Sequence, residues 1–259
     1  MPDSQPWKRL IADQPRANTE VPLNYTKDEA HVEFTRWSKS YDRSILQTLL
    51  FGPSRRALLK RIQDQKIESP KILDIGSGTG QFPEVLYHAL PEARVWALDL
   101  VRGMLEGGNR RWQQYADRIV PVQGDSESLP FESGSFDVLT CANSFHHYPN
   151  QAKAVAEMCR VLKPGGCLML IDGYRDALWG WFIYDLCVAS IEGNVHHASA
   201  KEVQAMMASA GFGTVDQFRH RGPAPFLFTL ARKPESKLPR PHLMTVGKIE
   251  PASAKRQAS

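Results

Sequence analysis

The residues with the clearest chemical meaning form a glycine-rich turn and an acid that follows it at a fixed distance. Asp74 interrupts an apolar run, and Gly76, Gly78 and Gly80 follow at alternate positions. Glycine permits a sharp turn and lets a ligand approach backbone amides, while the start of the next helix adds partial positive charge. A second apolar run ends at Asp99, 19 residues beyond Gly80, where a carboxylate can accept hydrogen bonds from ribose hydroxyls. This pattern predicts a nucleotide-binding strand, turn and helix.

Histidines are the candidate proton acceptors. His146 and His147 follow an apolar run, and His196 and His197 form a second adjacent pair. Imidazole titrates near neutral pH and suits the removal of a phenol or enol proton. Alternatively, the first pair packs and caps the start of the next helix. The two pairs lack accompanying carboxylates at ligand spacing, so we expect no metal site.

These residues need a scaffold, and the sequence indicates an open α/β sheet. Apolar runs alternate with helical patterns, which is typical of a parallel sheet with helices on both faces. Strands are predicted at 71–75, 94–98, 119–122, 136–142 and 167–172. Helices are predicted at 81–89, 102–116 and 150–162, with a turn at 163–166 where proline and glycine occur.

The pattern changes after residue 172. A helix is predicted near 199–210, and two strand-like runs follow at 213–220 and 225–232. Their four-residue connection can join only antiparallel strands. We therefore expect a Rossmann-like α/β fold, with a seven-stranded, mostly parallel sheet, an antiparallel C-terminal hairpin and helices on both faces.

Length and composition favour one domain between two irregular ends. With 259 residues and 42% hydrophobic content, the chain can bury roughly 75% of its unfolded surface in one core. Residues 1–27 are polar and contain four prolines, so we expect a flexible N-terminal segment. Residues 28–233 are the expected domain, and 234–259 are expected to form a disordered basic tail.

The net charge of +4 does not indicate a nucleic-acid partner. Seven of the 32 Lys and Arg residues and two of the 28 Asp and Glu residues lie from Arg232 onward, which leaves 25 basic and 26 acidic residues elsewhere. Such a balanced body lacks an electrostatic nucleic-acid footprint. The four cysteines form no Cys-x-x-Cys pair, and we find neither a signal peptide nor a long apolar stretch. We expect a cytoplasmic protein without integral membrane association.

Four motifs in order resemble the class I S-adenosylmethionine-dependent methyltransferases, in the type 11 branch that includes the ubiquinone and menaquinone methyltransferases. The resemblance spans about residues 31–232. The motifs are Leu73-Asp74-Ile75-Gly76-Ser77-Gly78-Thr79-Gly80, Ala97-Leu98-Asp99, Gly124-Asp125-Ser126-Glu127-Ser128-Leu129-Pro130-Phe131 and Arg160-Val161-Leu162-Lys163-Pro164-Gly165-Gly166.

The resemblance implies S-adenosyl-L-methionine as the cofactor, with the glycine loop around its methionine part. Asp74 would anchor nearby amides or the ligand ammonium, although it can also be a turn residue. Asp99 would accept both ribose hydroxyls, with a solvated strand-end acid as the alternative. Thr79 and Leu100 belong to the same expected cofactor contacts.

The remaining expected cofactor contacts come from three other segments. Asp125 would hold the adenine amino group with the amide of Ser126 beside it, or would only form a turn. Asn143 lies where the family's backbone meets the methionine end. Tyr41 resembles a lid tyrosine that reaches the cofactor carboxylate, and aromatic packing is equally consistent with it.

The acceptor is sought in the apolar, aromatic insert that contains Trp179, Trp181 and Tyr184. In the family, the segment after the fifth strand forms part of the acceptor site, which implies an aromatic or lipophilic small molecule. A buried core helix or the face of a homodimer explains the insert equally well.

The expected function is methyl transfer to O, C or N of such an acceptor. One alternative is a non-catalytic module that binds S-adenosylmethionine. Another is an NAD-dependent oxidoreductase, whose fingerprint would require glycine where Gln81 stands and no acid at Asp74.

Overall fold

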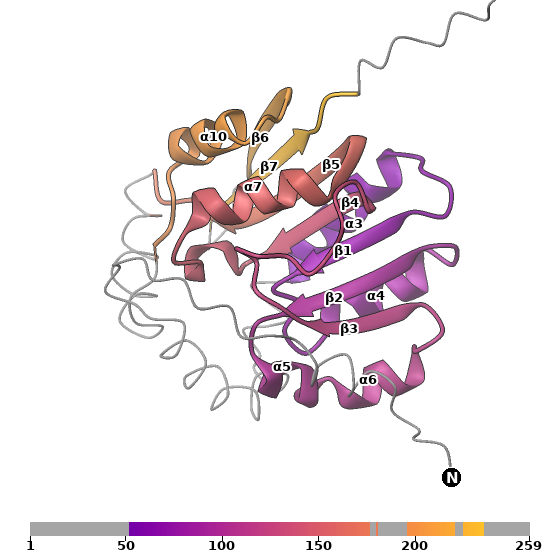
Figure 1. The fold of residues 1–259 in the computed structure, drawn as a ribbon. Coiled ribbons are helices and arrows are strands. Elements are labelled where there is room, and N and C mark those ends of the chain that lie inside the picture. Colours follow the sequence, from indigo (N-terminus) through magenta and orange to yellow (C-terminus); the bar gives the residue numbers. More distant parts are fainter. Residues whose placement is uncertain (1–51, 177–179, 181–195, 221–224, 236–259) are drawn as a thin grey trace, which may run out of the picture.

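A computed structural model describes residues 52–176, 180, 196–220 and 225–235 (Figure 1). Within these residues a seven-stranded sheet has the order β3-β2-β1-β4-β5-β7-β6, and β7 runs antiparallel to both of its neighbours. Its strands are β1 (Lys71–Ile75), β2 (Arg94–Asp99), β3 (Ile119–Gln123), β4 (Phe136–Ala142), β5 (Leu162–Gly173), β6 (Thr214–His220) and β7 (Phe226–Arg232). The predicted fold class is therefore confirmed.

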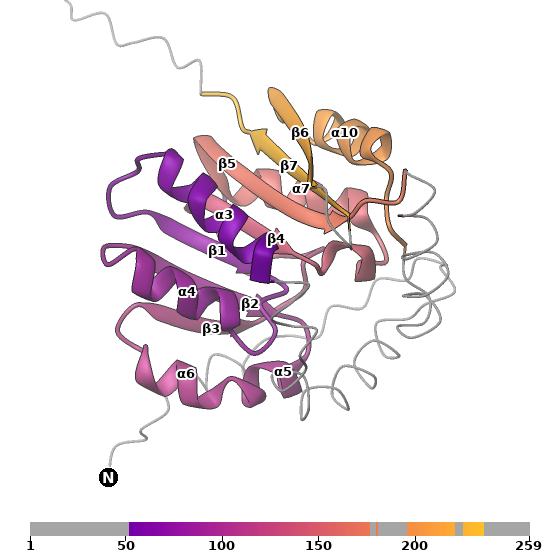
Figure 2. The same cartoon turned by 180° about the vertical axis from the view of Figure 1, so that it is seen from behind.

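Helices cover both faces of the sheet. One face carries α7 (Gln151–Val161) and α10 (Ala200–Ser209), and the other carries α3 (Gly52–Asp64) and α4 (Gln81–Ala89), which Figure 2 shows in front. Two short helices, α5 (Arg102–Gly107) and α6 (Asn109–Gln114), lie near the β3 edge. A 3-10 turn, η3 (Phe145–His147), follows β4.

Each face has its own hydrophobic core, because the central strands are apolar on both sides. β1 is buried from Ile72 to Ile75, as expected for a strand between two helical layers. Leu58 of α3 and Leu86 of α4 pack in one core, and Met158 of α7 packs in the other.

The strand predictions at 71–75 and 136–142 coincide with β1 and β4, whereas the helix predicted at 102–116 is interrupted. Gly108 separates α5 from α6 and fits closely against the glycine-rich turn. A Cβ atom built on Gly108 would lie 2.6 Å from the carbonyl oxygen of Thr79. Packing against that turn therefore determines the break.

The helix predicted at 150–162 ends at Val161 as expected, but the residues predicted as a turn at 163–166 belong to the start of β5, where the register with β4 is irregular. The Gly165 amide donates to the Lys233 carbonyl oxygen at 3.1 Å, and the Lys233 amide donates to Gly166 at 2.9 Å. These bonds extend the pairing between β5 and the end of β7. Helix α3 had no counterpart among the predicted elements.

The predicted domain limits stay predictions, since residues 28–51 and most of the two predicted end segments lie outside the described residues. In the described part of the chain, none of the helices is long and apolar enough to cross a membrane.

Candidate functional site

The candidate site lies at the carboxyl ends of the parallel strands. Strands β1, β2 and β3 follow one another outward in one direction, and β4 pairs on the opposite side of β1. Ligands of open α/β sheets bind in the crevice where the strand order reverses. The predicted cofactor residues that the structure describes follow or end β1, β2, β3 and β4, as the parallel arrangement requires.

The turn after β1 has the backbone that its glycines predicted. Gly76, Gly78 and Gly80 have φ values of 72°, 57° and 83°, which side chains rarely adopt. The amides of Gly76 and Ser77 donate to the carbonyl oxygen of Leu98 at 2.9 and 3.0 Å. These bonds attach the turn to β2.

Two of these glycines also lie against side chains from other elements. A Cβ atom on Gly76 would come within 2.3 Å of the Ser144 hydroxyl oxygen, and one on Gly80 within 2.0 Å of the Trp112 ring. Ser144 lies after β4 and Trp112 belongs to α6. The turn is therefore held from both sides, and neither position accepts a larger residue without rearrangement.

Asp99, at the end of β2, joins the glycine turn to the next segment. Its Oδ2 accepts from the Gly78 amide at 2.7 Å, and its Oδ1 accepts from the Val101 amide at 2.8 Å. With 8% of its surface exposed, Asp99 is buried, so the solvated strand-end alternative is wrong. Each carboxylate oxygen has more than one acceptor position, which leaves capacity for ribose hydroxyls.

Asp74 is the most unusual acid of the site. It is 3% exposed, and its Oδ1 accepts from the Thr140 hydroxyl at 2.6 Å. Burial raises its pKa to about 7, the Thr140 hydrogen bond opposes the rise, and the Asp99 charge adds to it. The carboxyl group is thus partly protonated near neutral pH, and a cationic ligand group nearby would favour the ionised form.

Asp125 follows β3 and forms a turn of its own. Its Oδ1 accepts from the Glu127 amide at 2.9 Å, and its carbonyl oxygen accepts from the Ser128 amide at 3.1 Å. The neighbouring Gly124 amide donates to the carbonyl oxygen of Asp99 at 3.0 Å. The turn-forming role is therefore present, and the contact of Asp125 and of buried Ser126 with adenine stays a prediction.

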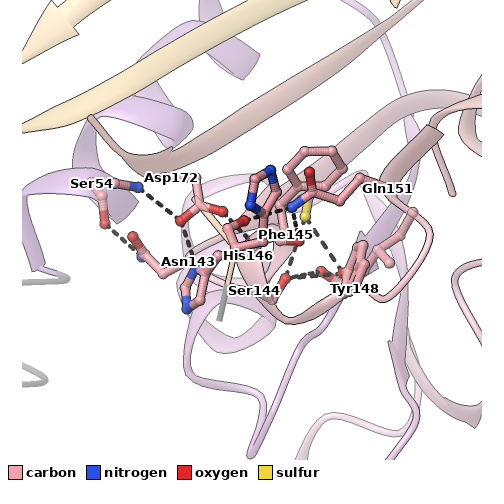
Figure 3. Close-up of polar contacts among 12 residues, drawn as sticks. Ser54, Asn143, Ser144, Phe145, His146, Tyr148, Gln151 and Asp172 are labelled. Carbon is pink, nitrogen blue, oxygen red and sulfur yellow. Dashed lines mark hydrogen bonds and ion pairs between the residues drawn. The ribbon is translucent and has the colours of Figure 1, made fainter. Parts of the chain in front are cut away.

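Two buried polar atoms beside the turn have no hydrogen-bond partner in the part of the chain that the structure describes. They are the hydroxyl oxygen of Ser77 and Oδ1 of Asn143. Asn143 adopts a φ of 54°, and its Nδ2 donates to the Ser54 hydroxyl at 3.3 Å (Figure 3). Buried polar groups are normally paired, so these atoms fit a polar ligand such as the amino acid part of S-adenosylmethionine.

A histidine and a carboxylate form a buried pair next to Asn143. The His146 Nδ1 lies 2.6 Å from Asp172 Oδ1, and its backbone amide donates to Asp172 Oδ2 at 2.8 Å (Figure 3). Burial favours a higher pKa for Asp172, but His146, His197 and the Gly173 amide together lower it. The carboxyl group is therefore ionised at neutral pH and can accept a hydrogen bond from Nδ1, so that Nε2 would be the ring nitrogen available for proton transfer.

Two further imidazoles contact the His146 ring. The His197 ring is stacked on it with centroids 4.4 Å apart and planes 17° from parallel, and the His147 ring lies 4.0 Å away at 49°. Burial, followed by the charge of His146, lowers the pKa of His197 to about 4 and that of His147 well below 6.5. Both rings are therefore neutral at neutral pH.

Ligand atoms of His146, Asp172 and His197 lie within 4.8 Å of one another, which is close enough to consider a metal ion. However, an imidazole binds a metal through a lone pair in its ring plane. Two stacked, nearly parallel rings have no common point in both planes, so this geometry does not favour a metal centre.

Cysteine chemistry does not fit this site. Burial raises the pKa of Cys141, at the end of β4, to about 12, so its thiol is protonated at neutral pH. Since nucleophilic cysteines act as thiolates, the imidazole and carboxylate groups are the better candidates for proton transfer.

Some predicted site residues lie outside the described part of the chain, and some site residues were not predicted. Tyr41, Trp179, Trp181 and Tyr184 lie outside the described residues. Sequence reasoning missed Asp172, although it ends an apolar run in the same way as Asp99. It also gave little weight to His197, whose contact with His146 depends on the tertiary structure.

Comparisons with known proteins agree with this geometry. Residues 73–170 match the model of the family described as methyltransferase domain. The chain is 34% identical over 156 residues to the ubiquinone/menaquinone biosynthesis C-methyltransferase UbiE of Cereibacter sphaeroides, covering 59% of this chain and 62% of that relative's length. It is 32% identical over 165 residues to the demethylmenaquinone methyltransferase of Listeria welshimeri, covering 61% of this chain and 69% of the relative.

Solved structures share the fold at lower identity. The [4+2]-cyclase SpnF has a TM-score of 0.68 at 15% identity, covering 85% of this chain and all of that chain. The YcgJ protein of Bacillus subtilis has a TM-score of 0.61 at 21% identity, covering 71% of this chain and all of its own. With the family model, the two relatives and the arrangement of the glycine turn, these findings show that the chain belongs to the class I S-adenosylmethionine-dependent methyltransferases.

Proposed function

We propose that this protein transfers a methyl group from S-adenosylmethionine to a small aromatic acceptor with an ionisable hydroxyl group, such as a phenol or a hydroquinone. His146, oriented by Asp172, serves as the general base. The observation that carries the proposal is the buried contact of 2.6 Å between His146 Nδ1 and Asp172 Oδ1, beside the cofactor turn.

Several described residues would hold the cofactor. The turn around Gly76, Gly78 and Gly80 would present its backbone to the cofactor, and Asp99 would accept from the ribose hydroxyls. Oδ1 of Asn143, which has no hydrogen-bond partner among the described residues, and the carboxylate of Asp74 suit the ammonium group of the methionine part. When bound, S-adenosylmethionine supplies an electrophilic methyl group on a positively charged sulfur.

His146 would prepare the acceptor for this transfer. Asp172 would accept a hydrogen bond from Nδ1, and Nε2 would then remove the hydroxyl proton of the acceptor. A deprotonated phenol or hydroquinone is nucleophilic at oxygen and at the adjacent ring carbon. For an oxygen acceptor, transfer would replace the carbon–sulfur bond of the cofactor by a carbon–oxygen bond and give S-adenosylhomocysteine, while His146 would keep the acceptor proton.

The relatives' names support the choice of acceptor class. One is named as a C-methyltransferase of ubiquinone and menaquinone biosynthesis and the other as a demethylmenaquinone methyltransferase, and the reduced form of a quinone is a hydroquinone. The predicted acceptor insert with Trp179, Trp181 and Tyr184 agrees with an aromatic ligand. The balanced charge outside the C-terminal tail favours a small molecule over nucleic acid, and the cysteine pattern favours a cytoplasmic location.

Transfer of a labelled methyl group tests the proposal. Phenols, hydroquinones and amines are each incubated with labelled S-adenosylmethionine and the wild-type protein. We expect product from hydroxyl-bearing acceptors and a loss of ~100-fold or more in His146→Gln, with S-adenosylhomocysteine binding retained. His196→Gln is the matched control, because the side chain of His196 is exposed.

Two results would contradict the proposal. Turnover with amines alone would exclude the hydroxyl-bearing acceptor class, and full activity of His146→Gln would exclude the proposed base. If S-adenosylhomocysteine binds but none of the acceptor classes yields product, the non-catalytic binding module becomes the better explanation.

A further inference from the structure

The buried His197 ring is stacked on the ring of the proposed base. His197 is 2% exposed, and its ring covers one face of the His146 ring, with the planes 17° from parallel. Among the described residues, the titratable groups near His146 include Asp172 of β5 and His147 of the same turn, and Arg175 donates to the backbone of His197. His197 thus replaces water over one face of a ring whose edge is bonded to Asp172.

The backbone that carries His197 is attached to the turn that carries His146. The His196 amide donates to the carbonyl oxygen of His146 at 2.9 Å. The buried Gln151 side chain donates to the carbonyl oxygen of Phe145 at 3.1 Å and to that of His196 at 2.8 Å. One amide group therefore connects the two segments, which are far apart in the sequence.

A third bond fixes the same segment to the end of β5. Nη1 of Arg175 donates to the carbonyl oxygen of His197 at 3.1 Å. Asp172 is three residues earlier in the chain, at the end of the same strand. The stacked ring and the carboxylate are consequently positioned by one piece of backbone, which keeps their geometry relative to His146 constant.

We propose that His197 is a positioning residue that holds the His146 ring in its bond to Asp172 and protects that bond from water. This inference rests on the proposed role of His146 in methyl transfer. A stacked flat ring restricts rotation of His146 about its side-chain torsion, and exclusion of water removes a competitor for the Nδ1 proton. A neutral ring serves this purpose without repelling the protonated base, and the buried His197 ring is neutral at neutral pH.

Nuclear magnetic resonance of the histidine ring protons tests the inference without any acceptor. The wild-type protein should show a low-field signal from the Nδ1 proton of His146 that exchanges slowly with water, assigned by its loss in His146→Gln. We expect the signal to be lost in His197→Ala and His197→Gln and retained in His197→Phe, which restores a flat ring. His196→Ala should retain it, because that residue contributes its backbone to the assembly and its side chain is exposed.

Folding of each variant is checked by its affinity for S-adenosylhomocysteine, which should stay within about threefold of wild type. Retention of the signal in a folded His197→Ala or His197→Gln protein would overturn the inference, as would its loss in a folded His197→Phe protein. With an acceptor in hand, His197→Ala should lower kcat ~10-fold or more with KM for the cofactor unchanged, and His197→Phe should restore most of it. If the ring signals behave as expected but the protein transfers no methyl group to any acceptor, the proposed function would be refuted. The positioning of the His146 ring by His197 would still stand.

Discussion

Replacing Asp74 by Asn should stabilise the cofactor-free protein, and the gain should grow as the pH rises. Asp74 is buried, and its pKa is raised from 3.8 to about 7, first by burial and then by the charge of Asp99, against the Thr140 hydrogen bond. Between these two pKa values the folded protein binds more protons at this site than the unfolded chain. The contribution of the Asp74 carboxyl group to the free energy of unfolding is therefore fully present below pH 3.8 and is lost as the pH rises through about 7.

The size of the effect follows from the difference between the two pKa values. A shift of about three units corresponds to about 4 kcal/mol of folding free energy above pH 8, at ~1.36 kcal/mol per unit. Asn has nearly the shape of the protonated acid and still offers an oxygen to the Thr140 hydroxyl. The Asp74→Asn protein should avoid this cost. Its free energy of unfolding should therefore exceed that of the wild type by about 4 kcal/mol above pH 8 and by less than about 1 kcal/mol near pH 4.

Urea unfolding of the cofactor-free protein at a series of pH values measures this difference. Asp64→Asn, a change at an exposed acid of α3, serves as the control and should show no comparable trend. The same Asp74→Asn protein should bind S-adenosylmethionine more weakly, since it lacks the negative charge opposite the ammonium group. An advantage that stays constant with pH, or a variant less stable than wild type at pH 8, would refute the argument.

Three further substitutions separate the cofactor turn, the fold and the proposed base. Gly80→Ala should lower stability by ~2 kcal/mol or more and weaken S-adenosylhomocysteine binding, because the new methyl group would overlap the Trp112 ring at a φ of 83°. Thermal unfolding with and without the ligand measures both. Arg160→Ala should lower stability by ~1–3 kcal/mol, because Arg160 bonds to Glu157 and to the carbonyl oxygens of Phe131 and Leu129. Asp172→Asn should reduce turnover ~100-fold or more with ligand binding retained. If turnover and ligand affinity fell by the same factor, Asp172 would not act by orienting His146.

Much of the fold was predictable because its signals are local. Apolar runs of strand length identified β1, β2 and β4 within one residue of their bounds. The break at Gly108 was not predictable, since it depends on contact with Thr79 and Trp112 from other parts of the chain. Strand β5 began earlier than predicted because pairing with Lys233 overrides the turn preference of its proline and glycines.

The candidate site likewise contains residues that the local sequence predicted and residues whose roles depend on tertiary contacts. The positions of Asp74, Asp99 and the glycines follow from a single strand and turn, so their spacing indicated a cofactor. The pairing of His146 with Asp172 joins two strand ends, and the stacking of His197 joins a segment beyond the insert. Such contacts between distant residues require the fold, although the position of Asp172 at the end of an apolar run was an available sign.

Calorimetric titration with S-adenosylhomocysteine tests the central claim most directly, because it needs neither an acceptor nor turnover. The account predicts saturable binding at one site per chain, with no binding heat from NAD under the same conditions. Binding of NAD without binding of S-adenosylhomocysteine would contradict the assignment of the glycine turn, Asp74 and Asp99 to a methyl-donor site.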